Sequence, residues 1–175
     1  MKAIGLCSHY SRQGDWAFHY ALTLARMHDV QLNIFHWLDS PFRFRRDYVY
    51  VDDKKETLVR VTDELIAKKE LELREYYDFW LGDFVKVGFR LCEGNEGAEL
   101  HRCLHRKEYD VLVVGYPEHG TDFGGEPIEK FASNFRTPVI MVGPDKPNSY
   151  HLNKRAVEIL DQLGIRQGDW TLIKP

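Results

Sequence analysis

Apolar residues concentrate in five short runs, and the stretches between these runs are polar or amphipathic. Each run has the length of a buried strand and is bounded by turn residues or charges. The run 110–114 (DVLVV) has almost no polar alternation, which is typical of the buried middle of a parallel sheet. The predicted strands cover residues 2–7, 30–37, 84–91, 110–114 and 138–142.

The stretches between the strands repeat their apolar positions at helical spacing. Asp15 is a candidate N-cap for the first helix, and Asn95 is one for the third. Leu58, Val61 and Leu65 fall on one stripe of a polar segment, which predicts one long helix or two short ones. The predicted helices cover residues 16–28, 53–81, 96–107, 126–134 and 152–163.

This alternation of strands and helices predicts an α/β fold, with an open parallel five-stranded sheet and helices on both faces. The α/β domain is expected to cover residues 1–145, and the Gly/Pro-rich linker GPDKPNS marks its end. Residues 146–175 then form a C-terminal extension with a short helix and an apolar tail. The extension is too apolar for a disordered tail, so we expect it to dock on the sheet domain.

Composition narrows the classes of partner and compartment. A net charge of −3 gives no overall attraction to nucleic acid or to an anionic membrane. No apolar run approaches the roughly 20 residues of a membrane-spanning helix, and the first residues lack the apolar core of a signal peptide. Cys7, Cys92 and Cys103 form no CxxC pair, which favours reduced thiols. We therefore expect a cytoplasmic protein.

The first third of the chain resembles the opening strand–helix–strand of a known family. KAIGLC, DWAFHYALTLA and VQLNIFHW follow one another in that order, and His36 stands where the family often has a histidine closing its second strand. LCEGNEGAEL is similar to the family's turn into its third helix.

The last part of the resemblance is the most specific. DVLVVG is followed by a glycine-containing loop and then by EKFASNFRTPVIMV, a helix leading into a proline-led final strand. Residues 2–143 as a whole resemble a universal stress protein domain. The resemblance implies a homodimer through the last core strand, residues 138–142, which in this family lies at the sheet edge and pairs with its twin.

Nucleotide-binding members of that family have a pattern like G-x2-G-x9-G-[ST] after the fourth strand, where glycines let backbone N–H groups approach phosphates. Gly115 matches the first glycine and Gly125 the last, but the loop is about three residues shorter than the pattern. Glu118 stands in place of the second glycine, and Glu126 in place of the Ser/Thr. We therefore expect weak ATP binding or none, with the Glu126 carboxylate at the start of the fourth helix taking the place of a phosphate.

Where the family often has an aspartate after the first strand, this sequence has Ser8 or His9. Open α/β sheets bind ligands at the carboxyl ends of their strands. The candidate cleft residues are Ser8, His9, His36, Gly115, Gly125 and Glu126.

Three other constellations were considered and set aside. His101 and His105 lie four apart on a predicted helix, but no third metal ligand accompanies them. FRFRR, at 42–46, interleaves aromatic residues with arginines, which favours a surface loop or lid over a nucleic-acid site. Ser8, His9 and Ser11 could suggest a nucleophile, but no GxSxG motif is present. We therefore expect neither catalytic nor metal-binding residues.

The leading hypothesis is a non-enzymatic stress-response or regulatory protein, a homodimer with a degenerate nucleotide cleft and no cofactor. The alternatives are an ATP- or AMP-binding protein with slow ATPase activity, using Mg²⁺, and a pure interaction module that binds a protein partner through FRFRR and the C-terminal tail. Neither nucleic acid nor membrane is an expected partner.

Overall fold

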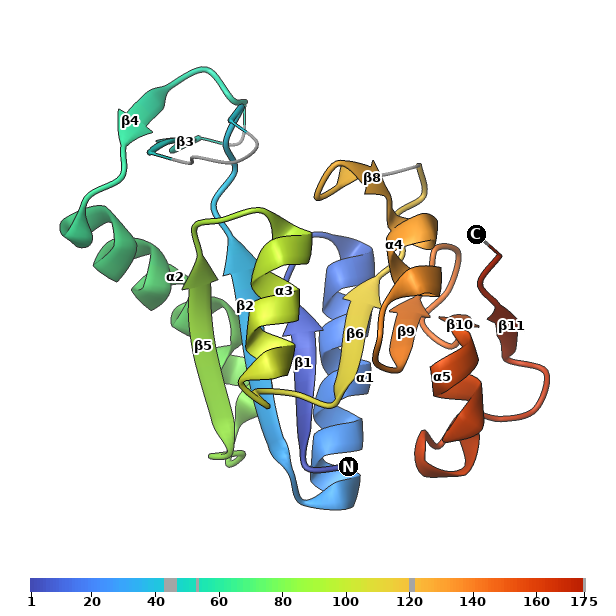
Figure 1. The fold of residues 1–175 in the computed structure, drawn as a ribbon. Coiled ribbons are helices and arrows are strands. Elements are labelled where there is room, and N and C mark those ends of the chain that lie inside the picture. Colours follow the sequence, from blue (N-terminus) through green and yellow to red (C-terminus); the bar gives the residue numbers. More distant parts are fainter. Residues whose placement is uncertain (43–46, 53, 120–121, 175) are drawn as a thin grey trace.

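The structure is a computed structural model, and it describes residues 1–42, 47–52, 54–119 and 122–174. Its centre is a seven-stranded sheet in the order β11-β10-β9-β6-β1-β2-β5 (Figure 1). Five of these strands are mutually parallel and correspond to the five predicted runs, which confirms the parallel α/β class. They are β1 (Ala3–Cys7), β2 (Gln31–Trp37), β5 (Val87–Cys92), β6 (Val111–Gly115) and β9 (Val139–Val142).

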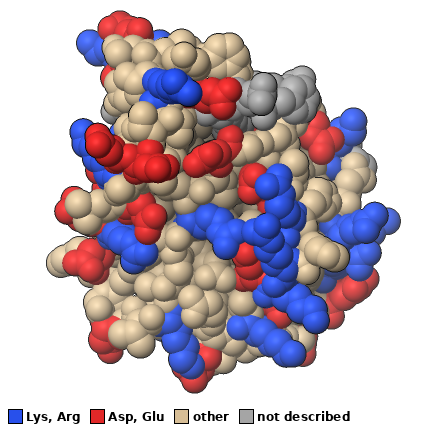
Figure 2. All heavy atoms as spheres, turned by 60° about the vertical axis from the view of Figure 1, so that its left-hand side comes forward, with Lys and Arg blue, Asp and Glu red and all other residues tan. Residues whose placement is uncertain are grey.

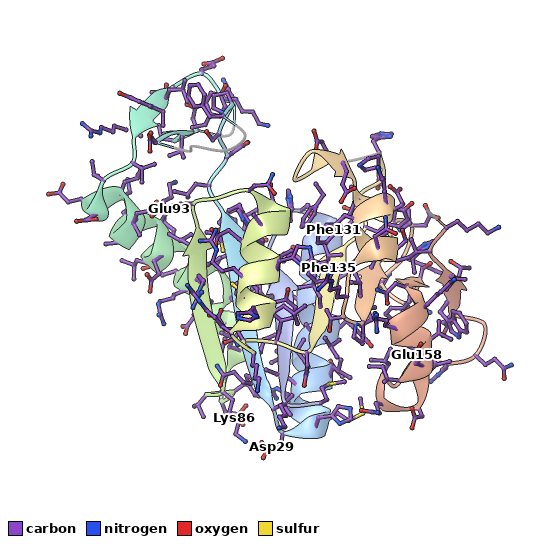
Figure 3. The ribbon with its side chains drawn as sticks, in the orientation of Figure 1. Asp29, Lys86, Glu93, Phe131, Phe135 and Glu158 are labelled. Atoms are coloured by element: carbon purple, nitrogen blue, oxygen red, sulfur yellow. The ribbon has the colours of Figure 1, made fainter. Side chains whose placement is uncertain are left out.

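Helices cover both faces of the sheet, as predicted, and each face has its own hydrophobic core. The helices α1 (Arg12–His28) and α2 (Asp63–Leu81) bury their apolar stripes in one core. The helices α3 (Glu96–His105) and α4 (Ile128–Asn134) do so in the other. Phe131 and Phe135 point from α4 towards α3, with ring centroids 4.7 Å apart (Figure 3). None of the helices described is both long enough and apolar enough to span a bilayer.

The sheet has two more strands than predicted, and both come from the C-terminal extension. Strand β10 (Tyr150–Leu152) pairs antiparallel with β9, and β11 (Trp170–Leu172) pairs parallel with β10. β9 is therefore an interior strand, hydrogen-bonded on one side to β6 and on the other to β10. The prediction that residues 138–142 form an open edge for a homodimer is wrong, because the chain's own extension occupies that edge.

The prediction that the extension docks on the domain is confirmed. Between β10 and β11 lie the short helix α5 (Lys154–Glu158) and a 3₁₀ turn (Leu160–Gln162). Leu152, Ala156 and Leu163 are fully buried in the core on the α1 side. The helix is shorter than the predicted 152–163, because Leu152 belongs to β10 and the α-helix gives way to the 3₁₀ turn after Glu158.

Two element boundaries differ from the predictions for identifiable reasons. α1 begins at Arg12 rather than after Asp15, since the Ser11 side chain accepts a hydrogen bond from the Gly14 N–H and caps the helix. Only 63–81 of the predicted 53–81 segment is helical. Before it, β3 (Tyr48–Tyr50) and β4 (Leu58–Arg60) form a small antiparallel hairpin that stands above the carboxyl ends of β2 and β5 (Figure 1).

Candidate functional site

A cleft of about 730 Å³ lies at the carboxyl ends of β1, β2 and β5, between the sheet and the β3–β4 hairpin. Parallel strands expose their final residues at this edge, which is where open α/β sheets bind ligands. Aromatic and imidazole rings form much of its wall: His9, Tyr10, His36, Trp37, Phe42 and Tyr50.

His36 joins the floor of the cleft to a buried hydroxyl pair. Its Nδ1 lies 3.3 Å from Ser8 Oγ, which in turn is 2.7 Å from the Tyr77 hydroxyl. Ser8 is buried beneath the cleft and does not line it. Burial, with the nearby His9 adding to it, lowers the pKa of His36 to about 4. The His36 imidazole is therefore neutral near pH 7.

Tyr10 covers one side of the cleft through two ring contacts. Its ring centroid is 4.6 Å from that of His36 and 4.5 Å from that of Tyr76. The Tyr76 hydroxyl donates a 2.7 Å hydrogen bond to Asp15 Oδ1 in α1. The stack therefore ties the loop after β1 to α1 and α2 and holds an aromatic wall in place.

Trp37 contributes a polar group without a partner. In the described part of the chain its Nε1 is buried and has no hydrogen-bond acceptor. The ring stands edge-on to Phe123, with centroids 6.3 Å apart. An unpaired buried donor of this kind costs about 1–3 kcal/mol.

The described lining is more acidic than basic: it holds five carboxylates and two lysines. Both lysines are already ion-paired, Lys55 with Asp39 at 3.0 Å and Lys69 with Glu72 at 2.9 Å. Figure 2 shows Asp and Glu side chains gathered in a band below the projecting lobe of β3 and β4. The described side chains thus offer a polyphosphate little positive charge.

The glycine loop after β6 folds into a second hairpin, of β7 (Asp122–Phe123) and β8 (Glu126–Pro127). The turn between these strands consists of two glycines, Gly124 and Gly125, with φ of 66° and 99°. The Gly125 N–H donates a 2.6 Å hydrogen bond to Asp122 Oδ1. Asn95 Nδ2 donates to the Gly124 carbonyl at 2.9 Å, which fastens the hairpin to the start of α3.

Glu126 does not begin the fourth helix, contrary to prediction. It lies in β8, α4 starts two residues later at Ile128, and the Glu126 carboxylate is 3.9 Å from Lys130 Nζ. The reason is the Gly124–Gly125 turn, which places Glu126 in an extended pair opposite Phe123. Of the loop's carboxylates it is Asp122, and not Glu126, that satisfies a backbone donor.

The structure separates the six sequence-predicted residues. His9, His36 and Gly125 line the cleft, whereas Gly115 and Glu126 do not and Ser8 lies below it. Gly115 instead faces the start of α1, where a Cβ atom would come within 2.7 Å of the Gln13 carbonyl.

Glu118, which stands in place of the second glycine, also lies at the start of α1. It forms an ion pair with Arg12 and accepts a 3.2 Å hydrogen bond from Gln13 Nε2. A second carboxylate of the same loop therefore already has donors from the protein.

The structure also shows where parts of FRFRR and of the His101–His105 pair lie. Of FRFRR, only Phe42 is described; it lines the cleft, and residues 43–46 lie outside the described residues. The His101 ring packs 4.7 Å from the Phe135 ring, and the described residues contain no group of three metal-ligating side chains.

Sequence reasoning missed Tyr10, Trp37, Asn95 and Asp122. The first three follow or end predicted strands, so the rule that ligands bind at carboxyl ends would have selected them. Asp122 precedes a Gly-Gly pair between two short extended segments, which is a recognisable hairpin signal.

No family model matches the sequence, and no curated protein matches it either. Solved structures do share its fold. A universal stress protein in complex with cAMP is 18% identical with a TM-score of 0.54, over 81% of this chain and 97% of that one. A universal stress protein family member from Burkholderia pseudomallei is 15% identical, with a TM-score of 0.53 over 82% and 96%. One from Archaeoglobus fulgidus is 15% identical, with a TM-score of 0.50 over 81% and 97%. The chain has the universal stress protein fold.

Proposed function

We propose that this chain is a non-enzymatic regulatory protein of the stress response, with a nucleotide-type cleft whose phosphate-binding part is filled by its own carboxylates. The observation that carries the proposal is the 2.6 Å hydrogen bond from the Gly125 N–H to Asp122 Oδ1. A backbone N–H in a glycine turn is the kind of donor that cradles phosphate, and here a carboxylate accepts from it.

Electrostatics support weak binding of polyphosphates. A phosphate placed about 4 Å from the Asp122 carboxylate would meet repulsion of about 4 kcal/mol per charge pair at an effective dielectric near 20. About 1.4 kcal/mol corresponds to a tenfold change in affinity, so even half of that repulsion is a large loss. Glu118, a second carboxylate of the same loop, is already paired with Arg12.

Two further features support this proposal. The first concerns catalysis and the second concerns the compartment. Ser8 is 4% exposed and hydrogen-bonds to Tyr77, so its hydroxyl is poorly placed to attack a substrate in the cleft. Cys7, Cys92 and Cys103 are free and buried, and burial raises the pKa of each thiol, which suits a cytoplasmic protein.

The second candidate is an adenine-nucleotide binder, with AMP or with ATP and Mg²⁺, and slow ATPase activity. It is favoured by the cleft's volume of about 730 Å³ and by the fold neighbour that was solved with cAMP. In that case the Asp122 carboxylate would help to hold Mg²⁺, which would offset the phosphate charge, and the role of this carboxylate would be reversed. The third hypothesis, a module that binds a protein partner partly through the C-terminal tail, is weakened because that tail is packed on the domain.

The test is calorimetry with ATP and AMP, with and without Mg²⁺, on the wild type and on two variants. Asp122→Asn keeps an oxygen that can accept from the Gly125 N–H and removes only the charge, whereas Asp122→Ala removes both. We expect weak metal-free binding of ATP to the wild type, and at least about tenfold tighter binding to Asp122→Ala.

Gains in both variants would assign the block to charge, and a gain in Asp122→Ala alone would assign it to the occupied N–H. Low-micromolar, metal-free ATP binding by the wild type would refute the proposal. Binding that requires Mg²⁺ and is lost in Asp122→Ala would establish the second candidate instead.

A further inference from the structure

The outward side of α2 is an exposed surface that neither the cleft nor the core uses. The inward side of this helix is buried on the sheet through Leu73, Tyr77 and Leu81. The helix lies at the outer left of the molecule in Figure 1, beside the outermost strand β5. Its exposed residues recur at helical spacing and form what we call the outward stripe: Glu64, Ala67, Lys68, Leu71, Glu75, Asp78 and Phe79.

Large apolar side chains are exposed on and beside this stripe. Phe79 is 88% exposed and Val85, just before β5, is 85% exposed, more than any other large apolar residue that the structure describes. Leu71 on the stripe and Trp80 beside it are exposed as well. A single exposed apolar residue is ordinary, whereas several close together in the structure indicate an interaction surface.

The charged residues of the stripe are available to another molecule. The neighbouring residues Lys69 and Arg74 form ion pairs within the helix, at 2.9 and 3.0 Å. Lys68 and Asp78, by contrast, form no ion pair with any residue that the structure describes. The surface therefore presents one cation in its N-terminal half and an anion in its C-terminal half.

The order of these residues makes the stripe complementary to its own reverse. Leu73 is the midpoint, with Lys68 and Asp78 five positions to either side of it. Ala67 and Phe79 are likewise six positions to either side. An antiparallel second copy thus brings Lys68 to the partner's Asp78 and the large Phe79 to the partner's small Ala67, and a two-fold axis repeats both contacts.

Charge also selects this direction over the opposite one. A parallel two-fold pair would place each Lys68 against the partner's Lys68 and each Asp78 against the partner's Asp78. Like charges across an interface are repulsive, so only the antiparallel arrangement satisfies both groups. A large side chain facing a small one lets two helix axes approach to the usual 8–10 Å.

We infer that the outward stripe of α2 is a homodimer interface, in which two copies of the chain pack this helix antiparallel about a two-fold axis. The stripe is about 22 Å long, from the helical rise per residue. Interfaces below about 1,200 Å² in total are those of transient complexes, so we expect a dimer that dissociates at micromolar concentration. The inference goes beyond the proposed function and does not depend on what the cleft binds.

Sedimentation velocity of the full chain across the micromolar range measures the dimer. Phe79→Ser should raise the dimer dissociation constant at least about tenfold, because two buried rings are lost from each dimer. Leu172→Ser is the matched control: this residue is also an exposed large apolar one, but it lies in β11 at the other end of the sheet. It should leave the dissociation constant unchanged.

A charge exchange tests the antiparallel arrangement itself. Lys68→Glu alone and Asp78→Lys alone each place like charges across the interface, and each should weaken the dimer about tenfold. The double variant restores an opposite-charge pair at both places and should dimerise like the wild type. A thermal melt at a concentration where the monomer predominates should be the same for all variants, because these side chains are exposed.

A full chain that stays monomeric throughout the range would overturn the inference and would mean that water or a different protein covers the stripe. A dimer that Phe79→Ser and both single charge variants leave unchanged would use another surface, and the inference would again be wrong. A double variant as weak as the single ones would exclude the antiparallel pair. None of these variants alters Asp122 or the cleft, so the inference and the proposed function fail independently.

Discussion

At the scale of single residues, Gly115 shows how a motif position can serve packing. It ends β6 directly beside the start of α1, and a Cβ there would lie 2.7 Å from the Gln13 carbonyl carbon and oxygen and 2.8 Å from the Gly14 nitrogen. Backbone atoms cannot move away as the end of a side chain can. The glycine that sequence reasoning assigned to phosphate binding thus allows a helix to approach a strand closely.

We predict that Gly115→Ala lowers the free energy of unfolding by about 1–3 kcal/mol, because the added methyl group displaces the first turn of α1. Denaturant unfolding followed by circular dichroism measures the loss. The control is Gly97→Ala in α3, where the nearest atom to the new Cβ would be Asn95 Oδ1 at 3.4 Å. That change should be neutral or slightly stabilising, because alanine favours the helix. Equal effects of the two substitutions would contradict this account of Gly115.

His36 makes a different kind of prediction at this scale, one of pH dependence. Its pKa is about 4 in the folded protein and about 6.5 in the unfolded chain, so the unfolded state binds a proton first as the pH falls. The stability contributed by neutral His36 is fully present above about pH 6.5 and is lost as the pH falls towards 4, by roughly 3 kcal/mol in total.

His36→Asn should therefore flatten the dependence of unfolding free energy on pH between 6.5 and 4. Chemical denaturation at several pH values measures the slope, and the exposed His105→Asn serves as the control. A wild-type slope retained in full by His36→Asn would show that other groups cause it.

At the scale of elements, the sequence predicted those segments whose own residues determine their structure. The strand 110–114 is apolar throughout, and Asn95 caps α3 as its position indicated, accepting from the Ala98 N–H at 3.3 Å. Strands β3, β4, β10 and β11 have only three residues each, too few to show a period of two. Leu58 fell on a helical stripe by chance and pairs in β4 with Tyr50.

The candidate site was predictable to a similar degree. The edge of the sheet, with His9 and His36, follows from strand order and chain direction. The acceptor of the Gly125 N–H could not be predicted in this way, because it depends on whether residues 122–127 form a hairpin or the first turn of a helix. The Lys55–Asp39 pair joins two residues 16 positions apart in the sequence, and no local pattern predicts such a pair.

The C-terminal extension is fastened to the domain by the side chain of Asn153. This residue is 1% exposed, and its Nδ2 donates to the carbonyls of Ala132 and Thr137 at 3.1 and 2.9 Å. Its Oδ1 accepts from the backbone N–H groups of Val139 and Ala156 at 3.0 and 2.9 Å. One amide thus joins α4, β9 and α5.

Asn153→Ala should lower the free energy of unfolding by about 2–4 kcal/mol, because it leaves buried backbone groups unpaired. Asn153→Asp keeps the acceptor but turns a charged oxygen towards two carbonyls, so it should be at least as harmful. The exposed Asn148→Ala is the control for urea unfolding. If Asn153→Asp were as stable as the wild type, the two bonds donated by the amide would contribute nothing.

At the scale of the whole molecule, both sides of the described sheet are protected against pairing with another chain. On one side β10 and β11 cover β9, and the outermost strand has three residues. On the other, β5 is preceded by Lys86, which pairs with Asp29 at 2.7 Å (Figure 3), and contains Arg90, which pairs with Glu108 at 2.9 Å. Charged side chains and short outer strands are the usual means of preventing edge-to-edge association.

We therefore predict that removing the extension changes the oligomeric state as well as the stability. Truncation after Lys146 deletes β10 and β11 and uncovers one side of β9, whose four residues are all buried in the full chain. It also removes Leu152, Ala156, Leu163 and Ile173 from the two cores, and burial of a large apolar side chain is worth about 1.5–3 kcal/mol. The uncovered strand would present a row of unpaired backbone N–H and C=O groups, which can pair with a strand of another molecule.

Light scattering at micromolar concentration should find more concentration-dependent association in the truncated chain than in the full chain. A thermal melt should show a lower melting temperature for the truncated chain. Circular dichroism must show that the truncated chain retains its helices, since an unfolded product would aggregate for a different reason. Removing only Lys174 and Pro175, which lie beyond β11, is the matched control and should change neither property. A truncated chain with the mass and melting temperature of the full chain would mean that β10 and β11 protect nothing, and that the edge of β9 is stable in water by itself.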